Sequence, residues 1–151
     1  MKGIESVATK AAGEDMTNSS IERLVYRSRV VHPAPMTALE DILPVAQAWN
    51  ARWGITGALG YTGRTYVQLL EGPTESLDSL LERLRSDLRH TDLRVLARGP
   101  AAGRLVTGWS MARIDLTLLE AEVTALLDAG DGEGLAALLA GLVRRGETEA
   151  R

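Results

Sequence analysis

The sequence predicts a single α+β domain, and three observations lead to that class. The chain has 151 residues, 45% of them hydrophobic and 25% charged, which suffices for one domain with a proper core and would be crowded for two. Segments in which apolar residues alternate, as in strands, are interspersed with segments in which they recur at helical spacing. Glycine- and proline-containing turns separate these segments, so each one is a candidate element.

Composition excludes several classes of function. The 17 Lys and Arg against 20 Asp and Glu give a formal charge of −3, which does not favour a nucleic-acid partner. Without cysteine the chain has no disulfide and no thiolate nucleophile, and two histidines are too few for a zinc cluster. No stretch approaches the roughly 18–20 apolar residues of a membrane span, and residues 1–20 lack the apolar run of a signal peptide. We therefore expect a cytoplasmic protein with no metal site and no membrane partner.

The first strand and the first helix each carry polar residues on a face that is otherwise apolar. Residues Ile21–Val31 alternate as in a strand. The residues on its apolar face are Leu24, Tyr26, Ser28 and Val30. A capping box formed by Thr37 and Glu40 predicts a helix that runs to about Trp53, and Asn50 lies on its apolar stripe.

A hairpin and a second helix follow. Residues 54–61 and 65–71 are predicted strands joined by a tight turn, and Gln68 shares a face with Tyr66 and Leu70. Pro73 occupies the favoured first turn of the next helix, which has a leucine stripe. The glycines within 54–61 have the wrong spacing for a dinucleotide-binding loop. We expect them to mark a bend or a close approach of two backbones.

Two strands, about Leu93–Arg98 and Leu105–Arg113, and two short helices, Leu116–Ala129 and Leu135–Arg144, complete the chain. The resulting order βαββαββ is that of the ferredoxin-like fold, a mixed sheet with two helices on one face. Strands one and three should then lie side by side, and we expect them to be parallel. The C-terminal helices, which are apolar on one side, either cap the open face of the sheet or form an interface.

Several polar side chains are predicted to face one interior space. They are Tyr26, Ser28, Asn50 and Gln68. A buried polar group without a partner costs roughly 1–3 kcal/mol, so this set, with Trp109 and Met111 from the last strand, favours a planar polar ligand between sheet and helices. Late in the second helix, Arg83 either complements the helix dipole or lines a rim of the site together with Asp87 and His90. No nucleophile-elbow motif is present, so we assign no catalytic residue.

Five short motifs occur in order along the chain and carry a family resemblance. They are Leu24-Val-Tyr26-Arg-Ser28, Asn50-Ala-Arg-Trp-Gly-Ile-Thr-Gly-Ala-Leu59, Gln68-Leu-Leu-Glu-Gly72, Asp87-Leu-Arg-His90 and Trp109-Ser-Met111. Together they resemble the BLUF family, the blue-light sensors that use FAD, from Ile21 to about Arg113. Trp49 departs from the family pattern, because relatives often have a flavin-contacting polar residue there.

The resemblance implies a role for each residue of the motifs. Tyr26 would be the photoactive tyrosine, and Gln68 would bridge it to the edge of the flavin ring. The residues implied to contact the cofactor are Tyr26, Ser28, Asn50, Gln68, Arg83, Asp87 and His90. Trp109 and Met111 would rearrange during signalling. The implied cofactor is FAD, with FMN or riboflavin as alternatives.

The sequence therefore predicts a blue-light photoreceptor, not an enzyme, that switches a Tyr–Gln–flavin hydrogen-bond network and signals to a downstream protein. We expect a homo-oligomer. The predicted segments are a flexible arm (1–20), the flavin-binding domain (21–113), a helical cap or interface (114–145) and a disordered tail (146–151). The alternative is a light-inactive ferredoxin-like adaptor or small-ligand-binding module, which would share the fold without the light response.

Overall fold

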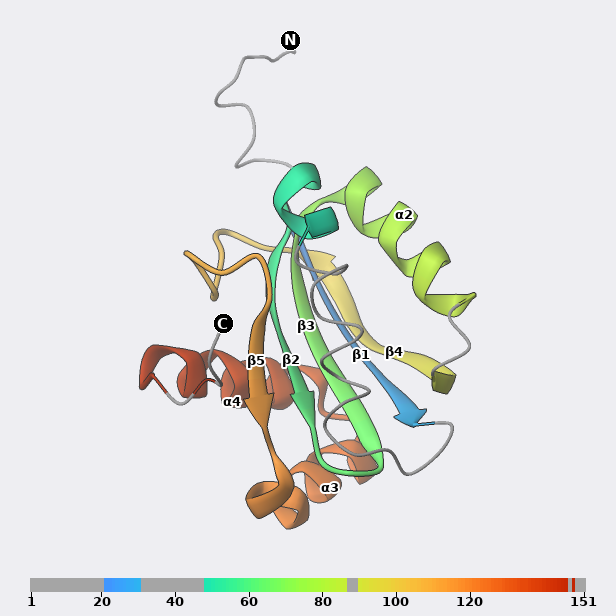
Figure 1. Ribbon diagram of the computed structural model, residues 1–151, viewed down its shortest axis with the longest axis vertical. Coiled ribbons are helices and arrows are strands. Elements are labelled where there is room, and N and C mark those ends of the chain that lie inside the picture. Colours follow the sequence, from blue (N-terminus) through green and yellow to red (C-terminus); the bar gives the residue numbers. More distant parts are fainter. Residues whose placement is uncertain (1–20, 31–47, 87–89, 147, 149–151) are drawn as a thin grey trace, which may run out of the picture.

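The computed structural model describes residues 21–30, 48–86, 90–146 and 148, and its centre is a five-stranded sheet in the order β4-β1-β3-β2-β5 (Figure 1). The strands are β1 (Ile21–Val30), β2 (Thr56–Tyr61), β3 (Thr65–Pro73), β4 (His90–Pro100) and β5 (Ala112–Asp115). Residues 48–53 are helical. The other helices are α2 (Thr74–Arg85), the short 3₁₀ helix η2 (Thr117–Leu119), α3 (Glu120–Asp128) and α4 (Gly132–Arg144).

The pairing of β1 with β3 is as predicted, but the predicted parallel direction is wrong. The two strands are antiparallel, and Tyr26 lies directly opposite Gln68. The hairpin explains the direction, because β2 and β3 are antiparallel to each other and β1 runs in the same direction as β2. Strand β3 lies between β1 and β2, which run in the same direction, and it is therefore antiparallel to both. The ferredoxin-like α+β fold itself is confirmed.

The last predicted strand is misplaced. We expected it at Leu105–Arg113, whereas β5 covers Ala112–Asp115 and pairs in parallel with β2. The segment from Arg104 to Met111 precedes this strand, and several of its backbone groups bond to side chains of other elements instead of to a ladder. Gly108 has a φ of +80°, which interrupts the extended conformation. Trp109 and Met111 therefore lie in a loop.

Two apolar layers cover the two faces of the sheet. On one face, Tyr26, Leu70 and Met111 pack with Leu77 of α2. On the other face, residues of β2, β3 and β5 pack against α3 and α4; in Figure 1, α4 crosses behind the sheet and α3 lies at its lower end. The buried residues that these two helices contribute are Val123, Leu135, Ala136, Leu139, Ala140 and Leu142. The C-terminal helices thus cover the face of the sheet opposite α2.

Two glycines of β2 allow close packing, as the sequence indicated. A Cβ atom on Gly57 would overlap the carbonyl of Leu69 on the neighbouring strand. A Cβ atom on Gly60 would overlap the side chain of Leu116 and lie 3.2 Å from Leu139. The first glycine therefore permits the approach of two backbones, and the second permits α4 to approach the sheet.

Some sequence predictions fall outside the described residues. These are the arm at 1–20, the capping box of Thr37 and Glu40, and Asp87. Among the helices that the structure describes, none has the length and apolar character needed to cross a membrane. In the same part of the chain, no group of acidic and histidine side chains is arranged to hold a metal ion.

Candidate functional site

A tyrosine, a glutamine and a methionine form a buried chain of polar contacts at the centre of the sheet. Tyr26 and Gln68 are 2% and 3% exposed, and the antiparallel register sets them opposite each other on β1 and β3. The Tyr26 hydroxyl donates a hydrogen bond to Gln68 Oε1. Gln68 Nε2 donates to Met111 Sδ at 3.2 Å. The amide therefore uses its acceptor end toward the tyrosine and its donor end toward the methionine.

Two further polar side chains beside this chain of contacts are buried with an atom unpartnered. Asn50 is fully buried, and its Nδ2 donates to the carbonyl oxygen of Ser110 at 2.8 Å. Within the described residues, Asn50 Oδ1 and the hydroxyl of Ser28, which is also fully buried, have no hydrogen-bond partner. Such orphans cost about 1–3 kcal/mol each, so a polar ligand that satisfies them fits this site.

The rim of the site is aromatic and cationic. Trp49 and Trp53 stack with their ring centroids 5.7 Å apart, and the Arg83 guanidinium lies 4.0 Å from the centroid of the Trp49 ring. Arg83 comes from the last turn of α2, and together with Asn50 it lines a small cavity between α2 and residues 48–53. The structure thus sets Arg83 at the rim, where it makes a cation–π contact.

Not all of the predicted residues meet at this site. Met111 contacts Gln68, whereas Trp109 is half-buried and packs against the apolar layer under α3 and α4. The expectation that both residues come from the last strand is therefore wrong, because residues 109–111 precede β5 and no strand sets their alternation. Of His90 the structure describes only the backbone, which begins β4.

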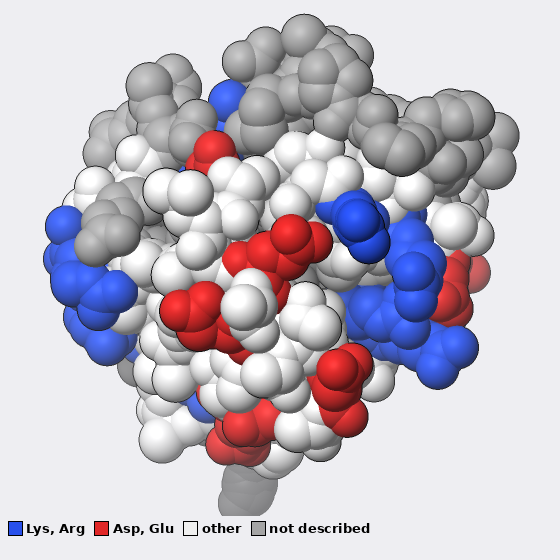
Figure 2. All heavy atoms as spheres, turned by 90° about the horizontal axis from the view of Figure 1, so that it is seen from below, with Lys and Arg blue, Asp and Glu red and all other residues white. Residues whose placement is uncertain are grey.

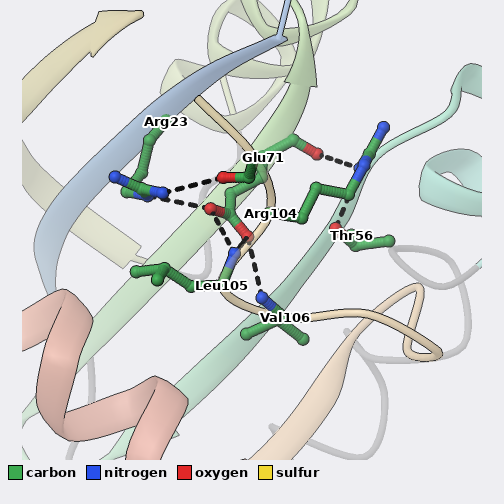
Figure 3. A network of polar contacts seen from close by, with 7 residues as sticks. Arg23, Thr56, Glu71, Arg104, Leu105 and Val106 are labelled. Carbon is green, nitrogen blue, oxygen red and sulfur yellow. Dashed lines mark hydrogen bonds and ion pairs between the residues drawn. The ribbon is translucent and has the colours of Figure 1, made fainter. Parts of the chain in front are cut away.

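A second buried network lies beside the site and was missed by sequence reasoning. Glu71 of β3 is fully buried, and its carboxylate accepts hydrogen bonds from Arg23 Nε at 2.8 Å and from the backbone N–H groups of Leu105 and Val106 (Figure 3). Arg104 donates to the Glu71 carbonyl oxygen at 2.8 Å, and burial lowers the pKa of this arginine although the neighbouring carboxylate opposes the shift. The only hint of this network in the sequence is that Glu71 is a carboxylate within an otherwise mostly apolar strand.

A cluster of arginines surrounds Asp92 on β4. Its carboxylate accepts bonds from Arg27, Arg29 and Arg94. The hydrogen bond from Arg27, followed by that from Arg94, lowers the Asp92 pKa from 3.8 to about 2. Viewed from the end of the molecule where α3 lies, acidic residues occupy the middle of the surface and basic residues its two sides (Figure 2). Neither sign of charge dominates this face.

Comparison with known proteins identifies the family. A family profile described as BLUF, sensors of blue light using FAD, matches residues 21–112. The chain belongs to the BLUF family. The matched residues include the whole Tyr26–Gln68–Met111 chain of contacts, so the polar centre of the sheet lies within the light-sensing domain. The chain thus carries a domain of the family of flavin-using blue-light sensors, as the sequence predicted.

Individual relatives agree with this assignment. Photoactivated adenylate cyclase subunit alpha of Euglena gracilis is 34% identical over 110 residues, which are 72% of this chain and 11% of that protein. The blue light- and temperature-regulated antirepressor BluF of Escherichia coli is 30% identical over 71% of this chain and 27% of its own length. The dark-state structure of the BLUF protein BlrB superimposes with a TM-score of 0.69 at 32% identity, covering 80% of this chain and 93% of that one. The chain therefore spans only a small part of the curated relatives.

Proposed function

We propose that this BLUF protein senses blue light by exchanging the hydrogen-bond partners of Gln68. The observation that carries the proposal is the two-ended use of the amide, which accepts from Tyr26 and donates to Met111. Rotation of the amide by half a turn exchanges its donor and acceptor ends. A donor then faces Tyr26 and an acceptor faces the sulfur, which has no proton to give. The exchange therefore breaks the contact to Met111.

The residues around the amide have separate proposed roles. Bound flavin supplies the absorption of blue light and, once excited, an oxidant. Tyr26 is the donor of an electron and a proton, and its hydroxyl is already directed to the Gln68 carbonyl oxygen. Asn50 and Ser28 offer their unpartnered atoms to the polar edge of the ring. Arg83 contacts the cofactor from the rim, and we propose the same for Asp87 and His90 on the strength of the family motif.

We propose FAD as the flavin, as the description of the family indicates. A solved relative at 38% identity is described as BlrP1 of Klebsiella pneumoniae with FMN and cyclic diGMP, so FMN is the nearest competitor. The test is to release the flavin from the purified protein and separate it by chromatography against FAD, FMN and riboflavin standards. Recovery of FMN alone from protein expressed in excess FAD would contradict the proposal.

We propose that the output is a change in protein–protein contacts, either with a downstream protein or within a homo-oligomer. The support is an apolar residue on the outside of the C-terminal helices, since Leu118 of η2 is 96% exposed. Leu118→Glu should leave the fold intact and lower the oligomeric state measured by light scattering. Glu122→Lys on the exposed part of α3 is the matched control. An oligomer that is unchanged by Leu118→Glu would count against this surface.

The experiment that tests the function is an absorption spectrum of the purified protein in darkness, under blue light and during recovery. A flavin spectrum that shifts slightly to longer wavelength and returns in darkness supports the switch. A flavin spectrum that does not shift would support the binding site and contradict the proposed switch. Protein that binds no flavin after reconstitution would favour the light-inactive adaptor.

A further inference from the structure

The loop between β4 and β5 is held at both of its ends, and different groups hold each end. At its first end, residues Arg104, Leu105 and Val106 bond to β3 or its neighbours. At its second end, the Gly57 N–H donates to the carbonyl of Trp109 at 3.3 Å, Asn50 to the carbonyl of Ser110, and Gln68 to the sulfur of Met111. Only Thr107 and Gly108 lie between these ends.

The first end is the more firmly fixed of the two. The Glu71 carboxylate accepts from the Leu105 N–H at 2.8 and 2.9 Å and from the Val106 N–H at 2.9 Å, with Arg23 as its counter-ion (Figure 3). Hydrogen bonds to a charged acceptor are roughly twice as strong as neutral ones. Arg104 adds bonds to the hydroxyl of Thr56 and to the carbonyl of Gly54, both at 2.8–2.9 Å.

The second end depends on the switch. Of its contacts, the one to Met111 is made by the amide that we propose to exchange its donor and acceptor. Between the two ends, Thr107 and Gly108 are exposed, and Gly108 has a φ of +80°, a conformation that glycine adopts without strain. Such a link can absorb a change of backbone angles while the residues before it stay in place.

We propose that Glu71 is a positioning residue of the light switch, whose carboxylate fixes residues 104–106 so that light moves only the residues from Thr107 to Met111. This rests on the proposed role of Gln68. Gln68 and Glu71 belong to the same strand but to its opposite faces, since Gln68 contacts Met111 in one apolar layer and Glu71 contacts Val106 in the other. Strand β3 therefore carries both the moving contact and the fixed one.

The consequence for recovery follows from geometry. While residues 104–106 are fixed, Met111 stays close to Gln68 after their contact is broken, so it has only a short distance to move back. If these residues are not fixed, the loop can move further from β3, and the contact between Gln68 and Met111 forms again more slowly in darkness. Changes within such coupled networks are worth about 0.5–2 kcal/mol, which corresponds to a factor of about two to thirty in rate.

The test uses Glu71→Gln together with a matched pair at Leu105. A glutamine has one acceptor oxygen, and its NH₂ group would face the donors that surround this site. Leu105→Pro removes an N–H that bonds to Glu71 and leaves the carboxylate, whereas Leu105→Ala shortens a side chain that is 37% exposed and keeps the N–H. The readouts are the rate of dark recovery and amide hydrogen exchange at single residues in darkness and under light.

In the unaltered protein, light should raise exchange at residues 107–111 and leave the Leu105 and Val106 amides protected. Glu71→Gln and Leu105→Pro should both slow recovery, while Leu105→Ala recovers within about twofold of the unaltered rate. Light-dependent exchange should extend to residues 104–106 in Glu71→Gln and to residues 104 and 106 in Leu105→Pro, which has no amide proton at position 105. If Glu71→Gln does not fold, the pair at Leu105 decides. Recovery and exchange that stay unchanged in Glu71→Gln and Leu105→Pro would overturn the proposal, even if both unfold at lower temperature.

Failure of the switch itself has a different signature. If the unaltered protein shows no light-induced shift, the role of Gln68 is wrong, and the proposal for Glu71 falls with it. In that case Glu71→Gln would still raise exchange at Leu105 and Val106 in darkness, as the loss of a structural contact requires. If the unaltered protein shows a normal light-induced shift and the variants have no effect, the proposed role of Glu71 is refuted and that of Gln68 is not.

Discussion

The substitution Tyr26→Phe removes one oxygen atom from the centre of the proposed switch. The ring is 2% exposed and packs in the apolar layer under α2, so phenylalanine fills the same space. The group that loses a partner is Gln68 Oε1, which accepts from the Tyr26 hydroxyl. A buried acceptor left without a donor costs about 1–3 kcal/mol, and in a chain of this length each kcal/mol lowers Tm by about 2–4 °C. We therefore expect a Tm lower by several degrees with the fold retained.

The assay combines thermal unfolding with absorption in darkness and under blue light. Tyr26→Phe should keep its flavin and lose the red-shifted state entirely, because the phenol is the proposed source of the electron and the proton. Tyr61→Phe is the matched control, since Tyr61 belongs to the same apolar layer and its hydroxyl bonds to the Gly63 carbonyl at 3.4 Å instead of to the amide. A normal light cycle in Tyr26→Phe would refute the role of this tyrosine.

Three further outcomes follow from the same structure. Gln68→Ala should abolish the light-induced shift and alter the dark flavin spectrum, and a shift of normal size in that variant would contradict the switch. Gly60→Ala drives a methyl group into Leu116 and should cost about 1–3 kcal/mol in urea unfolding, whereas Gly103→Ala, which has open space around it, should be close to neutral. Asp92→Asn tests a charge effect, because arginines hold the Asp92 pKa at about 2 instead of 3.8. The folded state gains stability from the carboxylate above pH 4 and loses this stability as the pH falls toward 2. The difference in free energy of unfolding between wild type and Asp92→Asn should therefore shrink over that interval. A difference that stays constant would contradict the prediction.

The parts of the fold with strong local patterns could be predicted. Strict alternation set the faces of β1 and β3, and so it predicted that Tyr26, Ser28 and Gln68 point into one layer. The glycines of β2 indicated close packing because a side chain is absent there. The direction of β1 relative to β3 is not a local property. It follows from the hairpin and the crossover together, and combining those two connections would have given the antiparallel answer.

The loop at 104–111 could not be predicted from its own sequence. Its alternating apolar residues resemble a strand, yet several of its N–H and C=O groups bond to a carboxylate and an asparagine amide from other elements. Each buried backbone N–H and C=O group needs a hydrogen-bond partner, but the local sequence does not indicate whether that partner is a strand or a side chain. For the same reason Glu71 was missed, since its role depends on donors 34 and 35 residues away.

The absence of a ladder at this loop has a direct bearing on the switch. In a strand, Trp109 and Met111 would share one face, and turning either side chain over would break the pairing with β2. Here the ladder between β2 and β5 begins at Ala58 and Ala112, immediately after the methionine. Met111 can therefore leave Gln68 while this ladder stays closed, because the contact between Gln68 and Met111 joins two side chains. A switch built from such contacts needs less energy than one that separates two strands, which is compatible with a state that reverts by itself in darkness.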